Sequence, residues 1–241
     1  MIFTAHLMFF PRTVLSSLKN IAIVTRASLF GIAQILLLMA QVQTQTSYMF
    51  LSAIFGNLIA ATIGSIMLNE RLSLTTLLGI FIAACGMILN MSLLSLTYLA
   101  ILGGIVQGLT IIISAKIASD KKAKTAGSVA IGFLFSAVIS FIWISLESSS
   151  NESFQSLNWQ KIYLLSSMLI LAQYAFFFLY RIHSIQRGSL LSLSRIPASM
   201  TLETKLGSTL LESTEILAAT LLFIASSLGS FKTKPPKSLI D

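Results

Sequence analysis

The stretch SYMFLSAIFGNLIAATIGSIMLNERLSLTTLLGIFIA (Ser47–Ala83) recurs in a diverged form as SLLSLSRIPASMTLETKLGSTLLESTEILAATLLFIA (Ser189–Ala225). Ten of the 37 aligned positions are identical at a constant offset of 142 residues. In both copies a glutamate, Glu70 or Glu212, follows a long apolar run, and a Phe-Ile-Ala triplet comes eleven residues later. The sequence therefore predicts two structural units of related construction.

The composition of the chain is typical of a membrane protein. Of the 241 residues, 55% are hydrophobic and only 10% are charged, whereas about a quarter of the residues in a soluble domain are charged. At about 20 residues for each span, the length suffices for about eight transmembrane helices and little else. The expected fold class is therefore an all-α integral membrane protein.

The charged residues predict how the spans are oriented. Eight apolar runs lie at about 21–41, 47–68, 73–91, 95–115, 126–146, 161–180, 188–211 and 215–231. Lys and Arg concentrate in every second connection, as in Lys116–Lys124. Arg12 and Lys19 precede the first run, and Arg26 lies in its first turns. Because cytoplasmic loops carry an excess of basic residues, this alternation predicts eight spans with both termini in the cytoplasm. The same excess accounts for the net charge of +8, so no nucleic-acid partner is expected.

The predicted topology gives the repeat an inverted orientation. The run 47–68 crosses from outside to inside, whereas its counterpart 188–211 crosses from inside to outside. The runs 73–91 and 215–231 are also related in this inverted way. Inverted repeats in membrane chains are typical of secondary transporters.

The two repeats differ in their number of helices. We assign the first, shortened repeat to residues 1–92, the second repeat to 93–231 and a cytoplasmic basic tail to 232–241. The second repeat contains five apolar runs and the first contains three. The short apolar segment Met1–Phe10 ends at a proline and is interpreted as a helix remnant or a re-entrant or interfacial piece. A wrongly assigned start codon or a truncated gene is the alternative explanation.

A short motif in the first repeat carries a family resemblance. The residues Leu68–Ser73 read Leu-Asn-Glu-Arg-Leu-Ser, and they are followed by Leu-Gly at 78–79 and Ala-Cys-Gly at 84–86. In their order and topology, these features resemble the EamA-type transporters of the drug/metabolite transporter superfamily. The resemblance implies an incomplete 5+5 inverted repeat and a permease that moves a small polar or amphipathic metabolite by alternating access.

The sequence departs from that family in several places. In the second copy Glu212 is kept, but Ser213 stands where the family has Arg. The proline common in the fourth helix of a repeat is absent from 47–68, while Pro197 lies in the matching part of 188–211. The alternative function is therefore a reduced relative that does not transport and serves as a structural or partner protein, or a decayed gene product. No enzyme is expected, because no acid–base or nucleophile constellation is present.

The run 188–211 is the most polar of the eight. Arg195, Ser199 and Glu203 recur every four residues, so a helix would place them on one side. In a transporter, Arg195 would meet an anionic group of the substrate, and Glu203 would pair with it or carry a proton. An internal Arg–Glu compensation explains the pattern equally well. Pro197 removes one backbone hydrogen bond and predicts a kink beside this stripe.

Other runs carry single polar residues near the middle of the predicted span. These are Gln34, Asn57, Gln107, Gln173 and Tyr174. The resemblance places their helices around a central cavity, which makes the set a candidate substrate-binding site. Taken singly, each is also explained by a hydrogen bond between helices, worth about 0.6 kcal/mol on average.

Glu70, Arg71 and Glu212 are candidate gate or fold-supporting residues at the two membrane faces. The alternative interpretation is capping of helix ends. Gly104 and Gly108 form a small-xxx-small pair, which predicts close helix packing.

Several classes of function are not indicated by the sequence. No phosphate-binding Gly-rich loop and only two histidines are present, so neither an ATPase domain nor a metal or other cofactor is expected. The expected location is a bacterial inner membrane, crossed several times. The expected partners are a small-molecule metabolite and the lipid bilayer, and a homodimer stays open.

Overall fold

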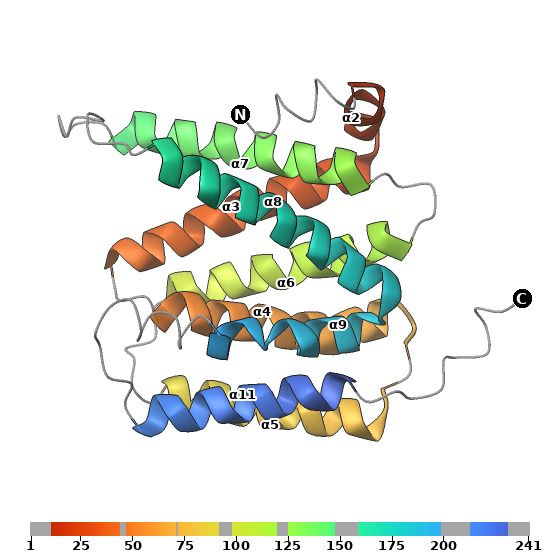
Figure 1. Ribbon diagram of the computed structural model, residues 1–241, viewed down its shortest axis with the longest axis vertical. Helices are drawn as coiled ribbons and strands as arrows, with labels where there is room; N and C mark the ends of the chain where they lie inside the picture. Colours follow the sequence, from red (N-terminus) through yellow and green to blue (C-terminus); the bar gives the residue numbers. More distant parts are fainter. Residues whose placement is uncertain are drawn as a thin grey trace, which may run out of the picture.

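The computed structural model describes residues 11–43, 47–70, 72–91, 98–119, 125–147, 159–198 and 213–230. Within these ranges the chain forms helices and no strand (Figure 1). The helices are α2 (Pro11–Leu18), α3 (Ile21–Gln43), α4 (Ser47–Met67), α5 (Leu74–Met91), α6 (Tyr98–Ser119), α7 (Thr125–Glu147), α8 (Trp159–Ile182), α9 (Ile185–Ser192) and α11 (Ser213–Ser230). The all-α class is therefore confirmed for the described part of the chain.

Each predicted apolar run coincides with a helix, except that the run 188–211 is not one continuous helix. The run 188–211 was expected to be a single span, but α9 begins at Ile185 and ends at Ser192. A turn at 193–194 separates it from a further helical segment at 195–198. The remainder of this run lies outside the described residues.

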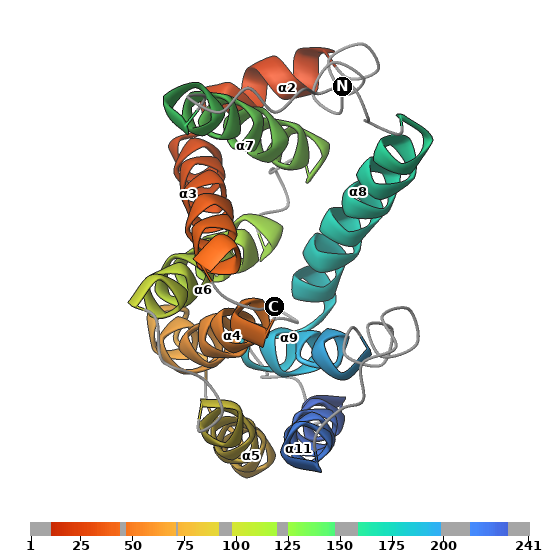
Figure 2. The same ribbon diagram turned by 90° about the vertical axis from the view of Figure 1, so that its left-hand side faces the viewer.

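Helices that the sequence repeat relates to each other pack together in antiparallel pairs (Figures 1 and 2). In the pair α5–α11, a Cβ at Gly79 would lie 3.4 Å from the Ala225 carbonyl oxygen, and one at Gly86 would lie 3.3 Å from that of Ala218. The residue numbers rise on one helix as they fall on the other, which establishes the antiparallel direction. In the pair α4–α9, Gly64 packs against Ile185 at the start of α9.

The two copies of the repeat also have matching burial. One hydrophobic cluster contains both Ile54 and its repeat counterpart Ile196, and both Ala83 and Ala225. The phenylalanines of the two Phe-Ile-Ala triplets are instead exposed, Phe81 at 67% and Phe223 at 60%. An alanine inside and a phenylalanine outside in each copy place the two copies in equivalent environments, so the contact between them is the core of this half of the molecule.

The other half is built from α3, α6, α7 and α8, with α2 packed against α7 (Figure 2). A second hydrophobic cluster, which includes Ile23, Val129 and Phe177, fills its interior. Helix α6 joins the two halves, because it packs against both α3 and α4. Cβ atoms at Gly104 and Gly108 would lie 3.0 Å from backbone carbonyl oxygens of α4, so the predicted close packing of this pair is confirmed.

The turn after α4 is fixed by backbone hydrogen bonds. Asn69 has a φ of 53°, the left-handed conformation in which helices commonly end. The N–H of Glu70 donates to the Ser65 carbonyl at 2.8 Å, the long bond of a Schellman motif. Ser73 directly precedes α5, and its hydroxyl accepts the Thr76 N–H at 3.2 Å as an N-cap. This turn therefore holds Glu70 in a defined position.

One described helix, Tyr98–Ser119, is long and apolar enough to cross a bilayer. Shorter apolar stretches occur in other described helices, at Ile21–Leu36, Leu51–Met67, Leu74–Leu89, Thr125–Val138 and Glu215–Ser230. Because the core helix of a soluble protein can meet the same criteria, the predicted count of eight spans stays a prediction.

Candidate functional site

A cluster of neutral polar side chains lies where α4 meets α9. Asn57 is 1% exposed in the middle of α4, and its Nδ2 donates to the Ala53 carbonyl at 2.8 Å. The Ser192 hydroxyl lies within hydrogen-bond distance of Asn57 Oδ1 and, at 2.8 Å, of the Ser189 carbonyl. One hydroxyl proton serves only one of these acceptors at a time. The two acceptors thus give this contact alternative hydrogen-bond arrangements.

The polar network extends to α8 through Tyr180. Its hydroxyl lies 3.3 Å from Ser189 Oγ, and the ring is buried. We refer to Asn57, Tyr180, Ser189 and Ser192 as the Asn57 cluster. Arg195 is close enough to Tyr180 for an electrostatic interaction, while its side chain is exposed. A positive charge therefore lies beside this neutral network.

The helix break next to the Asn57 cluster has a backbone cause. Pro197 has no N–H to bond to the Leu193 carbonyl, and that carbonyl instead accepts the Ile196 N–H at 3.0 Å. The N–H of Leu193 likewise bonds three residues back, to Leu190 at 3.1 Å. These shorter-range bonds replace the regular helical pattern, so the chain changes geometry directly after Ser192. The kink expected from Pro197 agrees with this position.

A second polar cluster surrounds Arg26, which the charge pattern marked only as a basic residue in the first turns of the run 21–41. Arg26 is 1% exposed and belongs to α3. Its guanidinium donates to Ser114 Oγ at 3.1 Å, to the Ser128 carbonyl at 3.1 Å and to Gln173 Oε1 at 2.8 Å. Gly132 leaves room for it, since a Cβ there would lie 2.8 Å from Nη1. We call Arg26, Ser114, Ser128 and Gln173 the Arg26 cluster.

Aromatic rings complete the surroundings of this guanidinium. Its central carbon lies 4.8 Å from the ring centroid of Phe177 and 5.3 Å from that of Phe30, which are cation–π distances. Helices α3, α6 and α8 contain no Asp or Glu in their sequences. The charge is thus stabilised by neutral oxygens and ring faces. An arginine inside an apolar run without an acidic residue was the signal that could have identified this site.

The candidate substrate-binding residues are divided among different surroundings. Asn57 belongs to the Asn57 cluster, Gln173 belongs to the Arg26 cluster, and Tyr174 lines a pocket beside α8. Gln107 lies against Gly56 at the α4–α6 contact, where its Oε1 is buried without a hydrogen-bond partner. Gln34 is half-buried on α3. The described residues therefore do not form one common binding pocket.

Glu70 caps a helix that is distant in sequence. Its Oε1 accepts the N–H of Ile185, the first residue of α9, at 3.0 Å. Burial raises the pKa of the Glu70 carboxyl above its ordinary value, although the N–H groups of Ile185 and Gln186 and the charge of Arg187 act in the opposite direction. Capping, one of the two interpretations considered for Glu70, thus describes its contact. The cap is on α9 and not on the helices that flank Glu70.

Four further candidates, Arg71, Ser199, Glu203 and Glu212, lie outside the described residues or have side chains that are not described. The part of the chain that the structure describes contains no group of three or more His, Cys, Asp or Glu side chains that could hold a metal ion.

No model of a known protein family matches this sequence, and no curated protein is significantly similar to it.

Proposed function

We propose that this protein is a multi-pass inner-membrane permease that moves a small polar or amphipathic metabolite by alternating access. The observation that carries the proposal is the contact between the two repeats. Helix α4 packs antiparallel to α9, α5 packs antiparallel to α11, and buried polar side chains of the Asn57 cluster lie at the first of these contacts. Two inverted units around a polar contact are the arrangement from which alternating-access transporters are built.

The Asn57 cluster has chemistry suited to a polar solute. Its amide and hydroxyl groups can donate and accept hydrogen bonds, and in the described state they bond to one another and to the backbone carbonyls of Ala53 and Ser189. A solute entering between α4 and α9 would have to replace these bonds, because buried polar groups left unpaired cost about 1–3 kcal/mol each. The solute must therefore carry hydrogen-bonding groups, and the nearby Arg195 favours one with negative charge.

The outer surface supports a membrane location. Large apolar side chains are exposed on most of the described helices, and on α6 they follow one face at Leu102, Ile105 and Leu109. On α11 the exposed set includes Ile216, Leu217 and Phe223. Soluble monomers rarely expose extended apolar patches, whereas lipid-facing helix surfaces are apolar. Lipid would cover these faces.

Solute flux into proteoliposomes tests the proposal. Purified protein would be compared with Asn57→Ala and Arg195→Ala, using a metabolite panel with and without a pH gradient. We expect flux of at least one anionic or polar solute, reduced at least tenfold in both variants. Arg12→Ala, which removes an exposed arginine of α2, is the matched control and should transport normally.

Absence of flux for every solute, from protein that is folded and inserted, would contradict the proposal. The reduced relative that does not transport would then be the better description. Flux that is equal in the wild type and in both site variants would keep the transporter and reject the Asn57 cluster as its site.

A further inference from the structure

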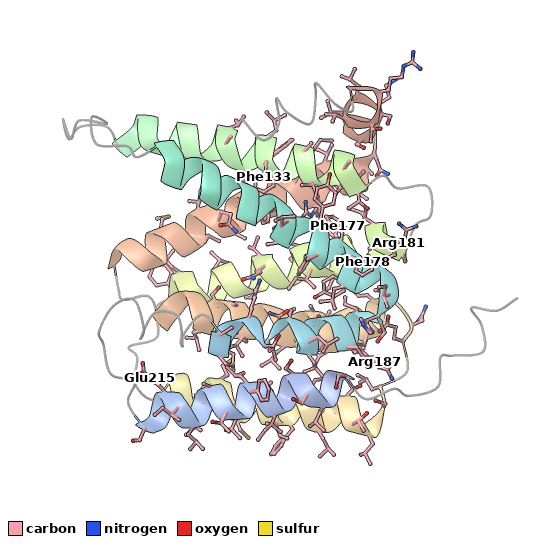
Figure 3. All side chains as sticks on the ribbon, in the orientation of Figure 1. Phe133, Phe177, Phe178, Arg181, Arg187 and Glu215 are labelled. Atoms are coloured by element: carbon pink, nitrogen blue, oxygen red, sulfur yellow. The ribbon has the colours of Figure 1, made fainter. Side chains whose placement is uncertain are left out.

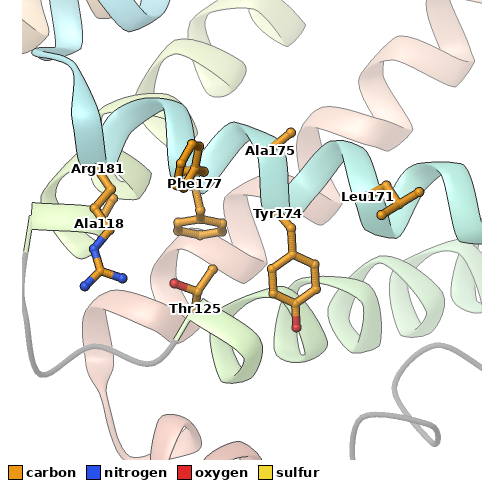
Figure 4. A pocket seen from close by; sticks show the side chains of 8 residues that line it. Ala118, Thr125, Leu171, Tyr174, Ala175, Phe177 and Arg181 are labelled. Carbon is orange, nitrogen blue, oxygen red and sulfur yellow. The ribbon is translucent and has the colours of Figure 1, made fainter.

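A pocket of about 450 Å³ lies beside α8 (Figure 4). Its lining residues from α8 are Leu171, Tyr174, Ala175, Phe177, Phe178 and Arg181, and Ala118 of α6 and Thr125 of α7 complete it. The volume falls within the range of about 300–1,000 Å³ that is usual for small-molecule sites. The pocket is therefore large enough to hold a small-molecule ligand.

The polar side chains that line the pocket are all hydrogen-bond donors, and the charged one among them is positive. None of its lining residues is acidic, whereas Arg181 contributes a guanidinium and Thr125 and Tyr174 contribute hydroxyls that can donate. In Figure 4 the Arg181 and Tyr174 side chains extend from α8 toward α7, and Thr125 of α7 lies between them in the view. A group placed among them would be bound best if it were negatively charged.

A second positive charge lies behind the pocket wall. Phe177 lines the pocket and also faces the Arg26 guanidinium at 4.8 Å. Arg26 is buried, and its described partners are neutral. Charges in such surroundings are screened much less than charges at a surface, so Arg26 adds to the attraction for an anion in the pocket.

The apolar part of the pocket is continuous with the outside of the helix bundle. Leu171 and Phe178 line it while remaining 69% and 65% exposed, and Figure 3 shows Phe177, Phe178 and Arg181 together along α8. An acyl chain could therefore lie along these side chains and leave the pocket sideways. Arg181 belongs to a basic connection that is expected on the cytoplasmic side, which is the depth of a lipid headgroup.

We propose that this pocket binds an anionic amphiphile, with its charged head at Arg181 and Thr125 and its acyl chain against Leu171 and Phe178. A membrane phospholipid with a negatively charged headgroup fits this chemistry, and so does a water-soluble single-chain anion. The proposal rests on the proposed membrane location but not on transport.

Native mass spectrometry of detergent-purified protein tests the proposal directly. The probes are phosphatidylglycerol, phosphatidylcholine with the same acyl chains, dodecyl phosphate and inorganic phosphate. We expect phosphatidylglycerol to bind at least tenfold more tightly than phosphatidylcholine. Arg181→Ala should abolish this preference, and Arg12→Ala, the loss of an exposed arginine on α2, should retain it.

The four probes distinguish a lipid ligand from a soluble one, and some of the results would contradict the proposal. Binding of phosphatidylglycerol would identify the ligand as a lipid. Binding of dodecyl phosphate without binding of phosphatidylglycerol would identify it as a soluble amphiphile. Equal binding of the two phospholipids, or an Arg181→Ala protein that behaves like Arg12→Ala, would overturn the proposal. Binding of inorganic phosphate as tight as that of dodecyl phosphate would overturn the role of the apolar wall, which Phe178→Ala tests independently through weaker binding of both amphiphiles.

Discussion

The two buried polar clusters differ in how their polar groups obtain hydrogen-bond partners inside the protein. The Asn57 cluster is neutral and lies at a contact between the two repeats, where Ser192 has a choice of acceptors. The Arg26 cluster is charged, and its guanidinium is fixed by three hydrogen bonds and two aromatic rings from four helices. Exchangeable neutral bonds allow neighbouring helices to move, whereas a buried charge binds its helices to one arrangement.

This comparison assigns different mechanical roles to the two halves of the molecule. The half formed by α3, α6, α7 and α8 should be the more rigid, because separating these helices would expose Arg26 without partners. The repeat contact formed by α4, α5, α9 and α11 should be the more easily rearranged.

The largest effect is expected from Arg26→Ala. The substitution removes the charge but leaves Ser114, the Ser128 carbonyl and Gln173 without their described partner in a buried site. We expect the free energy of unfolding to fall by about 3 kcal/mol or more. Denaturant unfolding in detergent, followed by circular dichroism, measures it.

Arg26→Lys serves as the companion variant. A lysine keeps the charge but loses the planar fork that reaches several acceptors, so it should recover only part of the stability. The rigid role of the Arg26 cluster would be rejected if Arg26→Ala were as stable as the exposed control Arg12→Ala.

The next effect is expected at Glu70. Glu70→Ala removes the acceptor for the first N–H of α9, and loss of a helix cap costs about 0.5–2 kcal/mol. Glu70→Gln keeps a carbonyl oxygen for Ile185 and should lose less. The same unfolding measurement at neutral pH compares the two variants.

Glu70 should also make the stability depend on pH. Because its pKa is raised in the folded protein, folding favours the protonated form. Its contribution is therefore fully present below the ordinary glutamate pKa of 4.5 and is lost as the pH rises through the raised value. The stability of the wild type relative to Glu70→Gln should decrease over this interval, and an unchanged difference would show that the carboxyl is not perturbed by burial.

A smaller loss is expected for Asn57→Ala. Ser192 can then donate to the Ser189 carbonyl alone, so only the amide's own bonds are lost, at about 1 kcal/mol. The unfolding free energy measures this loss, and a value as large as that of Arg26→Ala would remove the distinction between the clusters.

The smallest effect is expected for Tyr180→Phe. The hydroxyl lies at a long 3.3 Å from Ser189 Oγ, and the phenyl ring keeps the packing. We expect a change of about 0.5 kcal/mol or less in unfolding free energy. A larger loss would show that Tyr180 contributes to the repeat contact through more than this hydrogen bond.

Much of the fold follows from patterns within short windows of the sequence. The apolar runs gave the helices, and the constant offset between the repeats identified α4 and α5 as relatives of α9 and α11. Exposed Phe81 and buried Ala83 have the same environments as Phe223 and Ala225, as related sequences should. Local hydropathy is sufficient for these features because it decides which segments form helices.

The candidate site was harder to predict from the sequence, because its important contacts join residues that are far apart in the chain. Arg26 is 88 positions from Ser114 and 147 from Gln173, and no local pattern indicates that they meet. The cap from Glu70 to α9 and the resulting helix start at Ile185 likewise depend on tertiary packing. The family resemblance suggested one central pocket, but the packing divides Asn57, Gln173 and Tyr174 among three surroundings.

The bond between Glu70 and Ile185 also has a consequence for how the protein is made. The two residues are 115 positions apart, so at about 5–20 residues per second the ribosome finishes Glu70 roughly 6–23 seconds before Ile185. During that interval the carboxylate has water as its partner in place of the α9 N–H. Joining of the two repeats is therefore a late event in biogenesis. A nascent chain halted before α9 would still present the Glu70 carboxylate without its α9 partner to the quality-control machinery.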